Sequence, residues 1–289
     1  MAELNKVDKA QLEARKDRLE KAQLSRSDLE GIDLSGGFLK EAELKKCNLK
    51  KANLNEAGLN GADFTGSFLV GASFIQAQMI RANFTKTNLS GARLSGSDLS
   101  SAWFNNAVAL KADFHDSNLN RAEFNKAQLK GASFRNTHLS KSDFRGANLM
   151  QADLSGACIP KSHLSKANFS GAKLVEADVS ACNLSGCDFR ESDLRGADFT
   201  ESILVRVLFK GTDFTGANFA GASLRGADFT ETTMDGMNLE GADLELSTHL
   251  TCAQLKSARI DRKTKLPDYI ALHWLSDTEY ECSESAKTG

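Results

Sequence analysis

Proline and the larger aromatic residues are scarce in this chain, which has 2 prolines, 2 tryptophans and 2 tyrosines among 289 residues. Turns that recur along the chain must therefore be built by other residues, and the 22 glycines are the obvious source. No stretch approaches the roughly 18 apolar residues of a membrane-spanning helix, and the first 20 residues are too charged for a signal peptide. The sequence predicts a cytoplasmic protein with no membrane span.

An excess of charge of either sign is also missing. Lys and Arg number 36 against 38 Asp and Glu, a formal net charge of -2, which argues against direct nucleic-acid binding. Six cysteines stand at positions 47, 158, 182, 187, 252 and 282 and lack the CxxC or Cys/His spacings of zinc and redox sites. We expect all six to be reduced thiols.

What the chain has instead is a five-residue repeat. From Lys21 to Glu245 it reads as 45 consecutive blocks of five without an insertion. The fourth residue of each block is Leu, Phe, Met, Ile or Val, apart from Ala109, and the second is small in 42 of the 45 blocks. A short straight segment with a turn in every block explains this period, whereas a helix or a long strand does not. The second and fourth residues are expected to point inward.

Blocks such as Ala62-Asp63-Phe64, Ala152-Asp153-Leu154 and Ala197-Asp198-Phe199 match the pattern A-(D/N)-L-X-X. On these residues the chain resembles the pentapeptide-repeat family. The resemblance covers roughly residues 21 to 260. It implies an all-β solenoid, a right-handed quadrilateral β-helix with four blocks per coil and, for 45 blocks, about 11 coils.

The phenylalanines test the length of a coil, because like side chains tend to stack on like ones. Of 17 phenylalanines, 15 occupy the fourth position, and nine pairs among them are 20 residues apart, against two pairs at 15 residues. This spacing favours a 20-residue coil. It predicts one column with Phe64, Phe84, Phe104, Phe124 and Phe144, and another with Phe169, Phe189, Phe209 and Phe229.

The flanks predict three parts: an N-terminal capping helix over 1–20, the pentapeptide-repeat β-helix over 21–260, and a C-terminal cap with a disordered tail over 261–289. Leu4, Val7 and Leu12 form an apolar stripe on the first segment. Residues 269–275 are apolar enough to cap the last coil, and 276–289 are expected to be disordered. A homodimer through the C-terminal segment is one further possibility.

Nothing in the repeat predicts chemistry. A filled solenoid has no pocket in which catalytic groups converge, so we expect no catalytic residue, no bound metal or cofactor, and no small-molecule substrate. The Asp and Asn residues common at the third position are expected to bond to backbone in turns. Cys182 and Cys187 fall at the small inward position, where a thiol serves packing.

Surface positions that break the pattern are the candidates for binding. Phe68, Trp103 and Val108 replace the usual Asp or Asn, with Val70 and Leu110 beside them. A 20-residue coil places these five residues in one outward apolar patch on two adjoining walls, and such patches mark interfaces. Ile203 and Leu208 form a second apolar pair. They lie near the end of the stack, so we expect the C-terminal segment to bury them.

Two functions fit these features. The first is a non-enzymatic scaffold or adaptor that binds a partner protein, of unknown identity, along its outer walls. The second follows from the resemblance, because some family members mimic DNA and inhibit or protect DNA gyrase, a type II topoisomerase. Here the mimic is the acidic C-terminal half, with 12 basic and 20 acidic residues over 171–289. Its carboxylates include Asp178, Asp188, Asp193, Asp198, Asp213 and Asp228.

Overall fold

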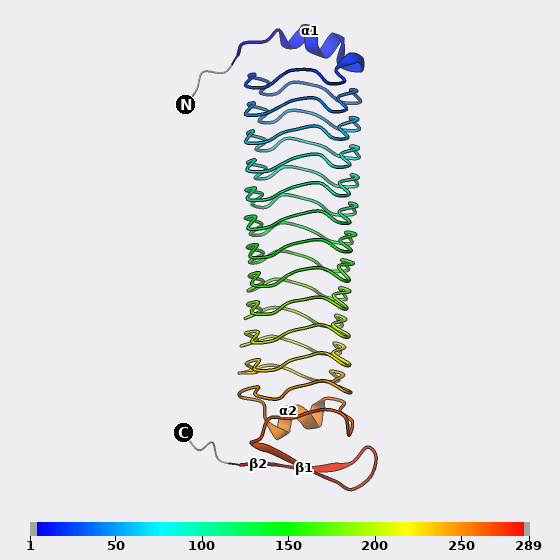
Figure 1. Cartoon of the computed structure of the whole chain (residues 1–289), viewed down its shortest axis with the longest axis vertical. Coiled ribbons are helices and arrows are strands. Elements are labelled where there is room, and N and C mark those ends of the chain that lie inside the picture. The colour runs from blue at the N-terminus through cyan, green and yellow to red at the C-terminus, as the bar shows by residue number, and fades with distance from the viewer. Residues whose placement is uncertain (1–4, 286–289) are drawn as a thin grey trace.

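The computed structural model describes residues 5–285, which form a rod of stacked coils (Figure 1). Helix α1 (Lys9–Ala14) and the 3-10 turn η1 (Lys16–Arg18) lie at one end of the rod. Helix α2 (Cys252–Ser257) and the hairpin of β1 (Ile270–Trp274) and β2 (Tyr280–Glu284) lie at the other. No helix in this part of the chain is long and apolar enough to cross a membrane.

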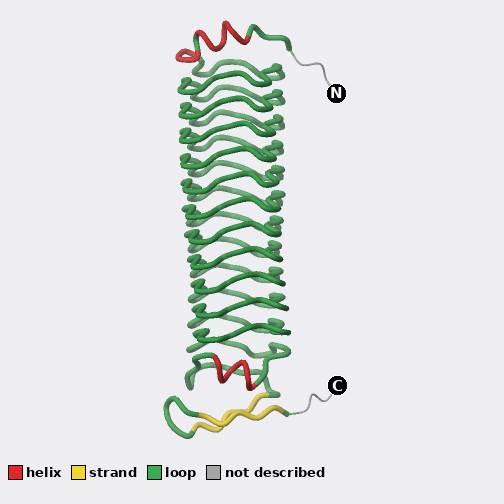
Figure 2. The backbone as a smooth tube through the Cα atoms, turned by 180° about the vertical axis from the view of Figure 1, so that it is seen from behind, coloured by secondary structure: helices red, strands yellow, loops and turns green. Residues whose placement is uncertain are grey.

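Each coil holds four five-residue blocks, as the phenylalanine spacing predicts. Parallel bridges join residues 20 apart, for example Asp63 to Asn83 and Asn83 to Trp103, and the series runs from Gln23 to Thr248. Only the third residue of each block forms such a bridge. The coils therefore contain single bridges and no extended strands, and Figure 2 colours them as loops.

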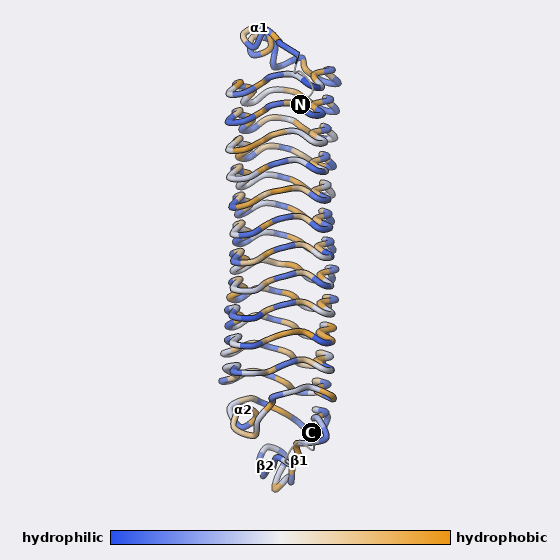
Figure 3. Tube along the Cα trace, turned by 90° about the vertical axis from the view of Figure 1, so that its left-hand side faces the viewer, coloured by the Kyte–Doolittle hydropathy of each residue, from blue (hydrophilic) through white to orange (hydrophobic). Residues whose placement is uncertain are grey.

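The interior is filled by the second and fourth residues of the blocks, and polar and apolar residues alternate around each coil (Figure 3). Phe104 has no exposed surface, and its ring stacks between those of Phe84 and Phe124, with centroids 4.9 and 4.6 Å away. Phe169 stacks on Phe189 in the second predicted column. Both predicted columns are confirmed.

The corners are built by the first residue of each block, which adopts a positive φ. Glycine accepts this conformation readily, but Lys46, Lys86 and Lys126 adopt it too, with φ of 56° to 58°. A long side chain at one corner lies over a glycine in the next coil: Lys46 Cγ stands 3.6 Å from where a Cβ of Gly66 would lie. A glycine at a corner therefore leaves room for the long side chain of the preceding coil.

Most polar groups near the core are paired with backbone, although the buried Ser247 hydroxyl has no partner within residues 5–285. Asp63 accepts a hydrogen bond from the amide of Thr65 at 2.9 Å, and this Asp or Asn contact to the residue two positions on recurs along the stack. The turn role expected for the third position is confirmed. Inside, the hydroxyl of Ser67 donates to the carbonyl of Leu44 at 2.5 Å, so a small polar residue at the second position also fits the core.

The N-terminal segment differs from the single helix expected over 1–20. Asn5 forms a parallel bridge with Ser27, and the helix begins only after Asp8, whose carboxylate accepts from the amide of Gln11. Leu12 is buried and Val7 packs partly against the core, whereas Leu4 lies outside the described residues. The carbonyl of Lys16 accepts from the amide of Phe38, so η1 pairs with the first coils.

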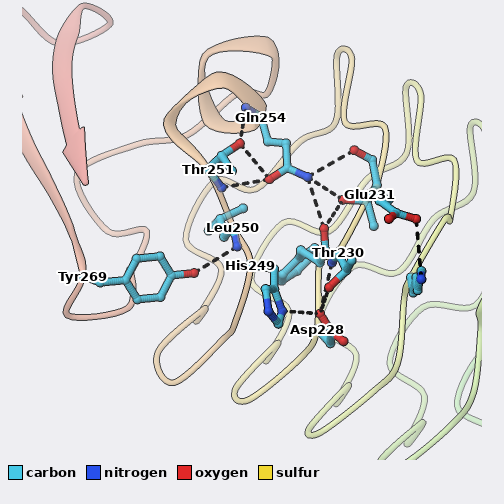
Figure 4. A network of polar contacts seen from close by, with 11 residues as sticks. Asp228, Thr230, Glu231, His249, Leu250, Thr251, Gln254 and Tyr269 are labelled. Carbon is cyan, nitrogen blue, oxygen red and sulfur yellow. Dashed lines mark hydrogen bonds and ion pairs between the residues drawn. The ribbon is translucent and has the colours of Figure 1, made fainter. Parts of the chain in front are cut away.

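At the other end, the stack continues past the predicted boundary at 260. Bridges join Asn238 to Arg259 and Asp243 to Lys265, so α2 is inserted within the last coil. Thr251 and Gln254 form a capping box at its start, and the Gln254 amide donates to the carbonyls of Phe229 and Thr232 (Figure 4). Elsewhere in the stack the carbonyl of a second residue accepts from an amide 21 residues later, which for Thr232 lies in α2, so Gln254 replaces that donor.

The hairpin corrects two further expectations. Residues 280–284 form β2 rather than a disordered tail, while 286–289 lie outside the described part. Cys252 and Cys282 form a disulfide, so the expectation of six reduced thiols is wrong. Sequence spacing hid this pair because the two cysteines are 30 residues apart and meet only when the hairpin folds onto α2. Disulfides persist in oxidising surroundings, so this bond does not support the expectation of a cytoplasmic protein.

Candidate protein-binding surface

The predicted patch residues lie on two adjoining walls of the stack. Phe68 is bridged to Asn88 and Asn88 to Val108, so Phe68 and Val108 share a column two coils apart, about 10 Å at β-ladder spacing. We call this face the Phe68 wall: its central column runs through residues 48, 68, 88, 108, 128, 148 and 168, and it includes the corners on both sides. Val70 and Leu110 lie at one of these corners.

Trp103 belongs to the next face, the Trp103 wall, where it is bridged to Asn83 and Glu123. Its side chain is 40% exposed, and no ring stacking or cation contact involves it among residues 5–285. Phe68 and Leu110 are 46% and 40% exposed, and Val70 and Val108 are half-buried. All five residues thus keep surface that a partner can cover.

The second apolar pair is also open, contrary to expectation. Ile203 is 47% exposed and Leu208 is 42% exposed, so the C-terminal segment does not bury them. The hairpin lies beyond the end of the rod instead of folding back along a wall (Figure 1). Its contacts explain this position: the Tyr280 hydroxyl donates to the Leu255 carbonyl at 2.7 Å, and the disulfide ties it to α2.

Carboxylates of the acidic half are largely engaged within the chain. Asp188 pairs with Arg190 at 2.6 Å, and burial alone would raise its pKa, but the Arg190 hydrogen bonds hold that pKa below its ordinary value. The Arg195 side chain lowers the pKa of Asp193 in the same way, at 2.8 Å. Four of the six carboxylates considered for DNA mimicry have a basic side chain as partner, since Arg195 also lies 4.0 Å from Asp213 and Asp228 bonds His249 at 2.9 Å (Figure 4).

Candidate catalytic groups do not converge in the described part of the chain. No three His, Cys, Asp or Glu side chains within residues 5–285 gather as a metal site requires. His115 contacts Asp113 at 2.7 Å on the outer surface. Cys182 and Cys187 are buried, and their thiols donate to the carbonyls of Ile159 and Leu164.

The two buried thiols predict a loss of stability at alkaline pH. Burial raises the pKa of both Cys182 and Cys187 to about 12, from an ordinary value of 9.0. Below pH 9 both states keep these protons and the stabilisation is complete. Between about pH 9 and 12 only the unfolded chain releases them, so the free energy of unfolding should fall by about 2.7 kcal/mol per pH unit.

Urea unfolding between pH 8 and pH 11 measures this slope. The matched control is the double variant Cys182→Ala and Cys187→Ala, because Ala is the usual occupant of the second position. Its slope should be shallower by the contribution of the two thiols. Equal slopes for the two proteins would show that the thiols ionise freely in the folded state.

Comparisons with known proteins agree with this architecture. Models of pentapeptide repeats match residues 22–61, 57–96 and 208–245 (8 copies) and 80–123 (9 copies), and a model of a pentapeptide repeat region matches 142–219. No curated protein sequence matches the chain.

Solved structures similar to this chain include one cyanobacterial protein and one plasmid-mediated resistance protein. HetL, a pentapeptide repeat protein involved in heterocyst differentiation regulation in the cyanobacterium Nostoc, is 26% identical, covering 79% of this chain and 93% of HetL, with a TM-score of 0.43. QnrB1, a plasmid-mediated fluoroquinolone resistance protein, is 19% identical, covering 77% of this chain and 90% of QnrB1, with a TM-score of 0.36.

Proposed function

We propose, from the premise that this chain belongs to the pentapeptide repeat family, that it is a non-enzymatic scaffold that binds a partner protein along its outer walls. The observation that carries the proposal is the exposed Trp103 on a wall where its bridged neighbours are Asn83 and Glu123. Tryptophan is enriched among the residues that dominate binding energy. Phe68, Val70, Val108 and Leu110 extend the same surface around one corner.

A Trp103→Ala variant tests this function. Binding of a partner purified from the source organism should weaken by at least about tenfold, because such anchors contribute about 2 kcal/mol or more. The free energy of unfolding should fall by no more than about 1 kcal/mol, since the side chain lies on the surface. Calorimetric titration and urea unfolding measure the two effects.

Ile203→Ala is the matched control. Ile203 occupies the same column as Trp103, five coils along the rod, and is exposed to a similar extent. Partner binding should be unchanged in this variant. If both variants weaken binding equally, or neither does, the Trp103 surface is not the binding site.

A DNA-mimicking role at gyrase is less well supported. The pairing of Asp188 with Arg190, and of Asp193 and Asp213 with Arg195, reduces the negative field that a mimic needs. We expect no inhibition or protection of gyrase in a supercoiling assay.

In this proposal the N-terminal and C-terminal segments are end caps that stabilise the β-helix. An open β-helix exposes unpaired backbone at its first and last coils. Lys16 and Gln254 each bond to backbone of a terminal coil, and the buried Leu12 covers the apolar interior. A homodimer formed through the C-terminal hairpin would leave the Phe68 and Trp103 walls free.

A further inference from the structure

The Phe68 wall has an unusual distribution of charge. Over the seven coils that contribute residues 45–51, 65–71, 85–91, 105–111, 125–131, 145–151 and 165–171, this wall carries no Asp or Glu. It carries ten basic residues, namely Lys45, Lys46, Lys50, Lys51, Lys86, Lys111, Lys126, Lys130, Arg145 and Lys166. The chain as a whole is nearly neutral, so carboxylates elsewhere on the protein offset the positive charge of this face.

The Trp103 wall shows that this pattern is not general. Over the same coils it carries five carboxylates, Glu41, Glu43, Asp63, Glu123 and Asp143. Two corner cations of the Phe68 wall are bound by them: Lys45 pairs with Glu43 and Asp63 at 3.4 Å, and Arg145 pairs with Asp143.

The other eight lysines of the Phe68 wall make no ion pair with any residue among 5–285. Several occupy corner positions with positive φ, where the stem of Lys46 or Lys126 lies over the glycine of the next coil. Their ammonium groups are left without a carboxylate. The positive charge of the Phe68 wall is therefore not cancelled by ion pairs on the wall itself.

The unpaired lysines surround the apolar residues of the same wall. Lys50 and Lys130 lie in the same corner column as Val70 and Leu110. Lys50 is one coil before Val70, and Lys130 is one coil after Leu110. Lys86 and Lys126 stand along the opposite corner, one coil before and one coil after the coil of Val108. An exposed apolar centre with cations on both flanks is complementary to a segment with apolar side chains between carboxylates.

We propose that the Phe68 wall is a docking surface for an acidic peptide segment of a partner protein, one that carries apolar side chains between its Asp and Glu residues. This inference rests on the proposed scaffold function and names the chemistry of the partner. From Lys46 to Lys166 the wall spans six coil steps, about 29 Å at about 4.8 Å per step. That length accommodates about nine residues of extended peptide.

A nucleic acid fits the same wall less well. Its phosphates would pair with the lysines, but its bases bind by stacking on aromatic rings, and the wall offers a single exposed aromatic residue, Phe68. Val70, Val108 and Leu110 are aliphatic and give no stacking surface. They lose water more favourably against leucine or phenylalanine side chains of a peptide.

The test uses the full-length protein and synthetic probes. The main probe is a peptide of about 12 residues that alternates Glu or Asp with Leu or Phe; two others replace either the acidic residues by Lys or the apolar residues by Ser. Single-stranded DNA of about 12 nucleotides is the nucleic-acid probe. Binding is measured by fluorescence anisotropy at about 0.05 M and about 0.5 M NaCl.

The charge variant carries Lys86→Glu, Lys111→Glu and Lys126→Glu. Its matched control carries Arg121→Glu, Lys141→Glu and Lys161→Glu. These three residues also occupy first positions with positive φ and make no ion pair within residues 5–285, but they lie on a corner away from the Phe68 wall. Both variants change the net charge equally, so the long-range charge effect cancels.

We expect the acidic apolar peptide to bind the native protein, and the charge variant to weaken that binding by at least about tenfold while the control changes it by less than about twofold. Either altered peptide should bind at least about tenfold more weakly. The inference is overturned if the peptide does not bind, if DNA binds more tightly, if the protein instead self-associates through this wall in sedimentation, or if both variants have equal effects. A Trp103-dependent partner whose binding is insensitive to the three Glu substitutions would overturn it and leave the scaffold function standing.

Discussion

A Phe104→Ala variant should lose about 3 to 5 kcal/mol of the free energy of unfolding. Phe104 is fully buried, stacks on Phe84 and Phe124, and meets Phe114 edge-on at 5.7 Å. Coils above and below are held at ladder spacing by backbone hydrogen bonds, so they cannot move together to fill the cavity. Urea unfolding followed by circular dichroism measures the loss.

Trp103→Ala is the control for this experiment. Trp103 is the preceding residue and is larger, but it points outward, so its loss should cost no more than about 1 kcal/mol. A change below about 1 kcal/mol for Phe104→Ala would mean that the column is loosely packed. The contrast between two neighbouring aromatic residues is the direct signature of the alternating pattern.

Removing the Cys252–Cys282 disulfide should have the second large effect, confined to the C-terminal end. The bond closes a loop across 30 residues, which corresponds to about 3 to 4 kcal/mol of chain entropy. A Cys282→Ser variant should therefore expose the β1–β2 hairpin to local opening. Hydrogen exchange of residues 270–284 should become at least about 100-fold faster, while exchange in the central coils stays unchanged, because stability in a solenoid is local.

Cys158→Ser serves as the control, since Cys158 is a free, half-buried thiol on a wall of the stack. It should leave exchange in the hairpin unchanged. If reduction or Cys282→Ser does not accelerate exchange there, the bonds of Tyr280 to the Leu255 carbonyl and of Glu284 to the Cys252 amide hold the hairpin without the disulfide.

The stack of coils could be predicted from the sequence because every five-residue block has the same pattern of inward and outward residues. One turn per five residues and one large inward side chain, such as Phe104, fix the coil, and like residues 20 apart reveal its length. The ends could not be predicted this way, because they are not periodic. Asn5 pairs with the first coil instead of starting a helix, and Cys282 finds Cys252 only through the tertiary position of the hairpin.

Part of the candidate binding surface could also be predicted from the sequence. Trp103 and Phe68 break a polar pattern, and sorting by position within the coil is enough to place them on adjoining walls. The same sorting, extended to whole walls, would have shown the carboxylate-free Phe68 wall. The prediction that the C-terminal segment buries Ile203 and Leu208 was wrong because it used only the distance along the rod. That distance shows that the segment can reach the two residues, but the Tyr280 hydrogen bond to α2 holds the hairpin beyond the end of the rod.

The binding role of the Phe68 wall can be tested most directly by photo-crosslinking in extracts of the source organism. A photoreactive amino acid is placed at Val108 or, as a matched control, at Asn118, which is also the third, half-exposed residue of its block but lies on the opposite wall. We predict a defined partner protein crosslinked from position 108, absent from position 118, and lost when Trp103→Ala is added. Equal crosslinking from both positions, or crosslinking that survives Trp103→Ala unchanged, would contradict a scaffold that binds through this surface.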